Sequence, residues 1–316
     1  MLLVEHVQRG YFLNTPIQAG SRLSLVSFAT LLLIALMMGS NHVAARFAFQ
    51  NGVDVATAAT MRSGGTGLAL AFLIWQQKVP IALSRQNKRG LLAIGALVGV
   101  QSLLIYSSVA RIPVALALLA FNSYPLWATA WARLIYRHRP EPVMLRAMPV
   151  MLIGLALALD VLGAASGLGA QAQWSLIGIG VGFAIAAALT FSLALVLIQH
   201  ETIGVDGRVR TLSTMCCALA LGLVAVSTQG GFHWPTADAG WWGLVGLTAL
   251  YGTAFTIMFT VLPRLGVVGN SAIMNIEPIF ALVLAWLLLD QAIAPIQVVG
   301  GLIVVATVVY LGLRKR

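Results

Sequence analysis

The chain has 316 residues, of which 59% are hydrophobic and only 9% are charged. A soluble domain carries roughly 25% charged residues, so this composition excludes a soluble fold and indicates a protein that lies in a bilayer. The net charge of +10 does not indicate nucleic-acid binding, because the basic residues lie in short gaps between apolar runs and not along a polar surface.

Apolar runs long enough to cross a membrane follow one another along nearly the whole chain. A spanning helix needs about 20 mostly apolar residues. Backbone groups in lipid must be satisfied within a helix or a closed barrel, and runs that are continuous and not alternating exclude a barrel. We therefore predict an all-α integral membrane protein with ten transmembrane helices. The predicted spans are 26–48, 53–75, 91–110, 113–135, 143–162, 175–199, 209–228, 241–262, 267–289 and 294–313.

Basic residues mark one side of the predicted membrane protein. We place the N-terminus on the inner side. Of the 19 Lys and Arg residues, only Arg46 and Arg111 then fall on the outer side, and Arg62 lies within the second span. The other sixteen fall on the inner side. Cytoplasmic loops carry the excess of Lys and Arg, so both termini are predicted to be cytoplasmic.

Part of the sequence repeats itself at a distance of 153 residues, which aligns Asn122 with Asn275 and Pro125 with Pro278. Five helices in each half is an odd number, so the second half enters the membrane from the opposite side. Inverted repeats of this kind recur in transporters, with the substrate site near the midplane between the halves. The predicted segments are a cytoplasmic N-terminal segment at 1–25 and two five-helix repeats at 26–162 and 175–313.

The shared Asn-x-x-Pro pairs lie near the middle of the fourth and ninth predicted spans. A proline inside a helix removes a backbone hydrogen bond and kinks the helix. Pro125 and Pro278 are therefore candidate hinges, or positions where carbonyls open to a cavity. The alternative is a static kink buried in protein, and the matched depth of the two prolines favours a functional role.

Several short segments, in this order and spacing, resemble the drug/metabolite transporter superfamily in its EamA-like ten-helix branch. They are residues 39–44, 61–62, 110–113, 122–126, 262–266 and 275–279. The resemblance spans roughly residues 26–313 and implies an exporter or exchanger of amino acids, other metabolites or drugs in a bacterial inner membrane. The polar first span is similar to that of the YddG-type exporters of aromatic amino acids.

One departure from the family concerns the Gly-Glu pair that often follows the fourth and ninth helices. The corresponding positions here are Tyr136-Arg137 and Leu289-Asp290. No role is therefore carried over for those glutamates.

Ionisable residues within the spans are candidate functional groups, because they are costly in lipid and usually face a cavity or a partner. Glu277 is the only acid near the middle of a span, so it is a candidate for proton coupling or for contact with a substrate amine. Arg62 is a candidate for binding a substrate carboxylate. The alternative for both residues is a structural ion pair with each other, or, for Glu277, a capping role beside Pro278. His42 is a cavity candidate together with Asn41, and Arg46 is expected to extend to the interface.

Other polar and aromatic side chains complete the candidate substrate cavity. An aromatic lining would suit indole or phenyl substrates through stacking, and the alternative for each residue is packing or a place in the interfacial belt. Trp131, Trp241 and Trp242 are assigned to that belt, and the pairs Gly95–Gly99 and Gly178–Gly182 to close helix packing. The remaining cavity candidates are Gln101, Tyr106, Asn122, Tyr124, Trp127, Tyr251, Phe255 and Asn275.

The sequence contains no P-loop, no His-Glu-x-x-His, no Gly-x-Ser-x-Gly and no paired intramembrane aspartates. We therefore predict a secondary transporter and not an enzyme, with no catalytic residue, cofactor or metal. It would export small molecules by alternating access, with aromatic amino acids the favoured substrates, as a monomer or homodimer. The alternatives are a transporter of another metabolite or drug class, and a membrane-embedded enzyme or scaffold.

Overall fold

The computed structural model describes residues 25–137, 142–160, 162–163, 167, 169–260, 276–291 and 294–313. Within these residues the regular structure is helical and no strand is present. The helices are α2 (Leu25–Gln50), α3 (Val55–Gln76), α4 (Arg85–Val109), α5 (Val114–Phe121), α6 (Tyr124–Tyr136), α7 (Pro142–Ala158), α8 (Ala170–Glu201), α9 (Gly207–Thr228), α10 (Asp238–Thr260), α11 (Glu277–Leu289) and α12 (Pro295–Leu313).

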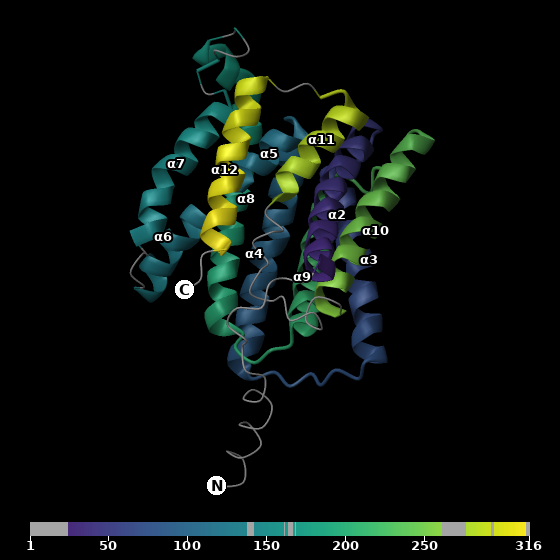
Figure 1. Ribbon diagram of the computed structural model, residues 1–316. Helices are drawn as coiled ribbons and strands as arrows, with labels where there is room; N and C mark the ends of the chain where they lie inside the picture. The colour runs from purple at the N-terminus through teal and green to yellow at the C-terminus, as the bar shows by residue number, and fades with distance from the viewer. Residues whose placement is uncertain are drawn as a thin grey trace.

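The helices pack side by side in a bundle (Figure 1). Helices α7 and α12 pack together at one side, and α2, α3 and α10 gather at the other, with α4 and α8 between them. Five helices are each long and apolar enough to cross a membrane: α2, α4, α8, α9 and the segment Asp238–Met258 of α10. Many large apolar side chains, such as Leu68, Trp75 and Ile179, point outward and are exposed. An apolar exterior of this extent is suited to lipid and not to water.

The predicted span at 113–135 is divided into two helices, α5 and α6, and is not one kinked helix. Pro125 has no N–H to donate to a preceding carbonyl, and the chain turns tightly just before it, where the Ser123 N–H donates to the Ala120 carbonyl at 3.2 Å. The side-chain amide of Asn122 donates to the Leu118 carbonyl at 2.8 Å. Pro125 then lies in the first turn of α6, where a helix needs no N–H.

Helix starts recur at the distance of 153 residues that separates the repeated motifs. Helices α4 and α10 begin at Arg85 and Asp238, and α7 and α12 begin at Pro142 and Pro295. Helices α6 and α11, which begin at 124 and 277, each have 13 residues, a proline in the first turn and a left-handed residue at the C-cap. Residues 267–275 of the predicted ninth span lie outside the described residues.

Contacts between helices also occur in matched pairs. Helix α2 packs on α10 as α4 packs on α8, and α3 packs on α10 as α9 packs on α4. The same matching appears at individual glycines. A Cβ on Gly99 of α4 would lie 3.1 Å from the Cα of Ala218 in α9, and a Cβ on Gly252 of α10 would lie 3.6 Å from the Thr66 hydroxyl in α3. Gly99 therefore allows the close approach of α4 to α9, as small residues do in other membrane bundles, whereas the contact at Gly252 leaves room for a Cβ.

The predicted packing role is confirmed for one glycine pair and wrong for the other. A Cβ on Gly95 would lie 2.5 Å from the Cys217 sulfur, so Gly95 and Gly99 both support the contact of α4 with α9. A Cβ on Gly178 would meet only Trp174 of its own helix, and one on Gly182 would meet nothing within 4 Å. Gly182 is exposed and Gly178 half-buried, so the pair lies beside the buried face of α8, and spacing alone could not tell on which face it lies.

Arg46, which was expected to extend to the interface, binds the end of a neighbouring helix. Its Nη1 donates to the carbonyls of Val109, at 2.8 Å, and of Ala110. These carbonyls lie at the C-terminal end of α4, where a helix has acceptors without partners of its own. The guanidinium therefore joins the end of α2 to the end of α4. Its positive charge interacts favourably with the negative end of the α4 dipole.

Candidate functional site

Arg62 is a buried cation held by three helices. It lies on α3, which begins at Val55 after Asp54 caps it by accepting the N–H of Thr57 at 2.9 Å. The Arg62 side chain is buried, and its Nη2 donates to the Ser102 hydroxyl of α4 at 2.6 Å. Its Cζ atom lies 4.7 Å from the ring centre of Tyr106 on α4 and 4.3 Å from that of Tyr251 on α10. Cation–π contacts of this kind favour a guanidinium that has lost its water.

Tyr106 links Arg62 to the polar part of α2. The Tyr106 hydroxyl donates to the Asn41 side-chain oxygen at 3.0 Å, and both residues are fully buried. The ring of His42 meets the Tyr106 ring edge to face, with ring centres 5.9 Å apart. The candidates Asn41, His42, Arg62, Tyr106 and Tyr251, which are distant in the sequence, are therefore brought together.

Glu277 joins this group from α11, of which it is the first residue. Its Oε1 lies 3.5 Å from Nε2 of His42. The two helices meet closely because Gly39 is on α2 one turn before His42, and a Cβ there would be 3.0 Å from the Glu277 carbonyl. The titratable side chain nearest the Glu277 carboxyl among the described residues is thus His42, and the alternative pair of Glu277 with Arg62 is not formed.

The central polar cluster consists of Asn41, His42, Arg62, Ser102, Tyr106, Tyr251 and Glu277. Three of its buried nitrogen atoms have no hydrogen-bond partner among the described residues, namely Nδ2 of Asn41, Nδ1 of His42 and Nε of Arg62. The hydroxyls of Thr60, Ser63 and Thr66 on α3 are buried without a partner as well. Nearly all buried polar groups in proteins are hydrogen-bonded, so this concentration of exceptions marks a place where a polar ligand or water would bind.

A second group of candidates lies around the break between α5 and α6. The Trp127 indole donates to the Ser123 hydroxyl at 3.2 Å. Tyr124 packs against Phe121 and Phe191, with ring centres 5.9 and 5.3 Å away. The Asn122 side-chain amide donates to the Leu118 carbonyl of the preceding helix. Together these residues stabilise the turn between α5 and α6 and its contact with α8.

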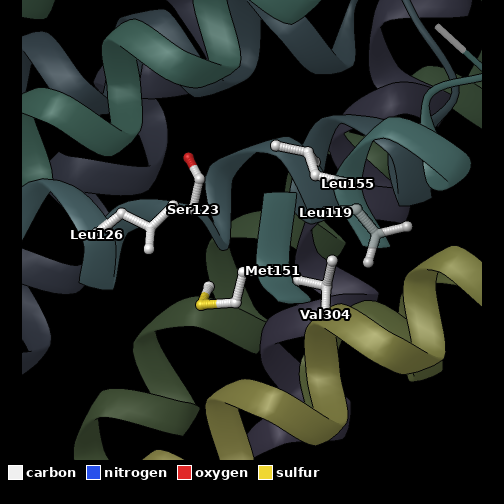
Figure 2. A pocket seen from close by; sticks show the side chains of 6 residues that line it. All are labelled: Leu119, Ser123, Leu126, Met151, Leu155 and Val304. Atoms are coloured by element: carbon white, nitrogen blue, oxygen red, sulfur yellow. The ribbon is translucent and has the colours of Figure 1, made fainter. Parts of the chain in front are cut away.

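A small hollow lies beside the same break (Figure 2). Its lining is apolar apart from one hydroxyl. The lining residues are Leu119, Ser123, Leu126, Met151, Leu155 and Val304. Nothing in this lining would recognise a charged or strongly polar ligand.

The remaining candidates are at the edge of the cluster or outside it. Phe255 packs on Tyr251 with ring centres 4.5 Å apart, and Gln101 is half-buried on α4. Asn275 lies outside the described residues. Trp131, assigned to the belt, donates its indole N–H to the Leu189 carbonyl of α8 at 3.2 Å, so it is also a packing residue.

Sequence reasoning missed the buried hydroxyls of α3. Thr60, Ser63 and Thr66, whose hydroxyls have no hydrogen-bond partner among the described residues, were not among the site candidates. A signal existed, because these residues recur at intervals of three within a largely apolar helix. Among the described residues, no group of three or more His, Cys, Asp or Glu could hold a metal ion.

An all-helical bundle with an apolar exterior and a buried polar cluster defines a multi-pass membrane protein. The model of the EamA-like transporter family matches residues 26–159 and 178–313, so the chain belongs to the EamA-like transporter family. Members of this family are membrane transporters of small substrates, and not enzymes.

The fold is also that of known structures. One solved chain, described only as "Crystal structure of protein", has a TM-score of 0.58 and 18% sequence identity, and the match covers 90% of this chain and 95% of that one. At this identity the likeness concerns the fold alone. No match was found among curated proteins.

Proposed function

We propose that the protein is a secondary transporter of the bacterial inner membrane, and that the central polar cluster holds the substrate during transport. The observation that carries this proposal is the set of buried nitrogen donors on Asn41, His42 and Arg62 without partners. In a membrane protein such groups are costly and mark substrate or ion pathways. Buried donors without partners lower the stability of the fold. A transporter needs such polar groups, because they must be available to bind its substrate.

Matched halves support alternating access as the mechanism. Helix starts that recur at 153 residues, and the paired contacts of α2 with α10 and of α4 with α8, fit two inverted five-helix repeats at 26–162 and 175–313. Two related packings can exchange roles, which opens a midplane site to each side in turn. Pro125 and Pro278, each in the first turn of its helix, are the proposed hinges. The charge bias supports ten spans with both termini cytoplasmic.

Amino acids are the substrates we propose, with aromatic amino acids favoured. The cluster contains a guanidinium, Arg62, and a carboxyl, Glu277, so it offers partners for both charged ends of an amino acid. The rings of Tyr106, Tyr251 and Phe255 are close enough to pack against a substrate ring. The proposed unit is a monomer or homodimer in lipid, without nucleic acid, cofactor or metal, and export is the proposed direction.

Glu277 is the proposed proton-coupling group. Its carboxyl faces His42 on α2 at 3.5 Å, and Arg62 and the tyrosines at 106 and 251 complete the charged and titratable groups of the cluster. A carboxyl that gains and loses a proton as the site changes its exposure would couple transport to a proton gradient. Glu277 begins α11 and directly precedes the proposed hinge at Pro278, so a change in its charge would be transmitted to the helix.

The test is flux of labelled tryptophan and phenylalanine in proteoliposomes, with threonine as the control and then a broad metabolite panel. Protein-dependent movement of the aromatic amino acids above threonine is the expected result. If only another metabolite or drug moves, the substrate assignment is refuted, but the proposal that the protein is a transporter stands. Absence of movement for the whole panel would refute transport, and would favour a membrane enzyme or scaffold.

A further inference from the structure

The guanidinium of Arg62 has an arrangement that a merely structural arginine does not need. No carboxylate among the described residues lies within ion-pair distance of it, although it is buried on α3 inside a membrane bundle. Its hydrogen bonds go to neutral hydroxyls, those of Ser102 and Tyr106. A buried cation without an opposite charge is strongly destabilising unless something else neutralises it.

Two tyrosine rings determine where a neutralising group can approach. The Arg62 Cζ atom lies over both rings, 4.7 Å from the centre of Tyr106 and 4.3 Å from that of Tyr251, so the two rings cover part of the guanidinium. The N–H groups of an arginine point outward in the plane of the guanidinium, so a further hydrogen-bond partner must lie in that plane. At that edge Nε is buried and has no partner among the described residues.

A second donor without a partner lies on the other side of Tyr106. The Asn41 amide oxygen accepts the Tyr106 hydroxyl at 3.0 Å, which directs the amide nitrogen Nδ2 away from it, and this nitrogen has no partner either. The site therefore has a surplus of donors near its one unpaired cation. A planar anion with two oxygens complements a guanidinium edge, since arginine binds carboxylates through two parallel hydrogen bonds.

We infer that Arg62 is the receptor for a carboxylate of the transported substrate, and that Asn41 is a further donor to the same group. This inference rests on the proposed function and assigns the residues that bind the carboxylate of its substrate. Lysine could not replace the arginine, because a compact ammonium neither stacks between two rings nor presents a planar fork. Amines and neutral drugs without a carboxylate are excluded as good ligands.

Acid and amide pairs of the same compound test the inference directly. Purified protein in detergent is titrated calorimetrically with L-phenylalanine and L-phenylalaninamide, and with the corresponding pairs of leucine and threonine. Loss of charge-assisted hydrogen bonds predicts that the best-bound acid binds about ten- to a hundredfold more tightly than its amide. In Arg62→Lys this ratio falls toward one. Arg111→Lys is the matched control, because Arg111 also lies over an aromatic ring, that of Phe183 at 4.8 Å, but is exposed.

Each result decides one of the two proposals. An acid-to-amide ratio near one in the wild-type protein overturns the carboxylate inference, and this measurement does not depend on whether Arg62→Lys folds. A ratio that persists in a folded Arg62→Lys variant also overturns it. A transported substrate that has no carboxylate overturns the inference and leaves the transporter function intact, whereas absence of flux for every compound refutes the function itself.

Discussion

The contact between α2 and α11 depends on a single hydrogen atom at Gly39. A Cβ added there would lie 3.0 Å from the Glu277 carbonyl oxygen, 3.1 Å from the Ala281 nitrogen and 3.4 Å from the Phe280 Cβ. The two nearest atoms belong to the backbone, so no side-chain rotation can relieve the crowding. We expect Gly39→Ala to push α11 away from α2 and to lengthen the contact of His42 with Glu277.

The size of the effect follows from two opposing terms. Overpacking a well-packed interior costs about 1–3 kcal/mol, and replacing glycine by alanine in a helix favours folding by about 1 kcal/mol. Gly182→Ala on α8 should show only the gain in helix propensity, because a Cβ there meets nothing within 4 Å. The difference between the two variants therefore isolates the packing term, and Gly39→Ala should be the less stable by about 1–3 kcal/mol.

Denaturant-induced unfolding of the purified protein in detergent, followed by tryptophan fluorescence, measures both variants against the wild-type protein. We expect Gly182→Ala to be at least as stable as the wild type. If Gly39→Ala unfolds with the same free energy as Gly182→Ala, the close approach of α2 to α11 is not a constraint on this protein. The argument that Gly39 positions Glu277 would then fail as well.

Three further predictions concern single side chains. Glu277→Gln should abolish the pH dependence of transport in proteoliposomes, and unchanged pH dependence would remove Glu277 as the coupling group. Tyr106→Phe leaves the buried Asn41 oxygen without its donor and should lower the free energy of unfolding by about 1–3 kcal/mol, a loss that equal denaturation midpoints would contradict. Asp206 caps α9 by accepting the Arg208 N–H at 2.8 Å, so Asp206→Ala should cost about 1 kcal/mol. Hydrogen bonding to the Arg208 side chain holds the pKa of Asp206 below its usual value, so this stabilisation is present above about pH 4 and is lost as the pH falls further, which a pH series of the same measurement checks.

Hydropathy predicted the helices well because lipid permits few backbone conformations. Apolar runs of the right length must be helical in a bilayer, and α2, α3, α7, α8, α9, α10 and α12 begin or end within a few residues of the predicted spans. The start of α4 at Arg85 was missed by six residues, since a polar first turn does not register as an apolar run. The division of the fourth span was predicted only as a kink, because proline shows where hydrogen bonding fails and not how the chain turns around the failure.

The site was predicted in part. Asn41, His42, Arg62, Tyr106 and Tyr251 were all candidates, because a polar residue in lipid needs a partner or a cavity. Their partners were not predictable. Glu277 was paired with Arg62 on charge alone, whereas the helix packing sets Glu277 beside His42 and surrounds Arg62 with aromatic rings. Charge is a property of one residue, but an ion pair depends on the angle and distance between two helices.

By itself, the sequence determined that this protein is helical, that it lies in a membrane and that motifs recur 153 residues apart, since composition, run length and repetition are properties of the linear chain. Only the tertiary structure decided which polar residues meet, which glycines lie at contacts and where unpaired donors gather. The reason is that a helix has residues of similar polarity on several faces, and packing against neighbours at glycines such as Gly39 and Gly99 selects the face that is buried.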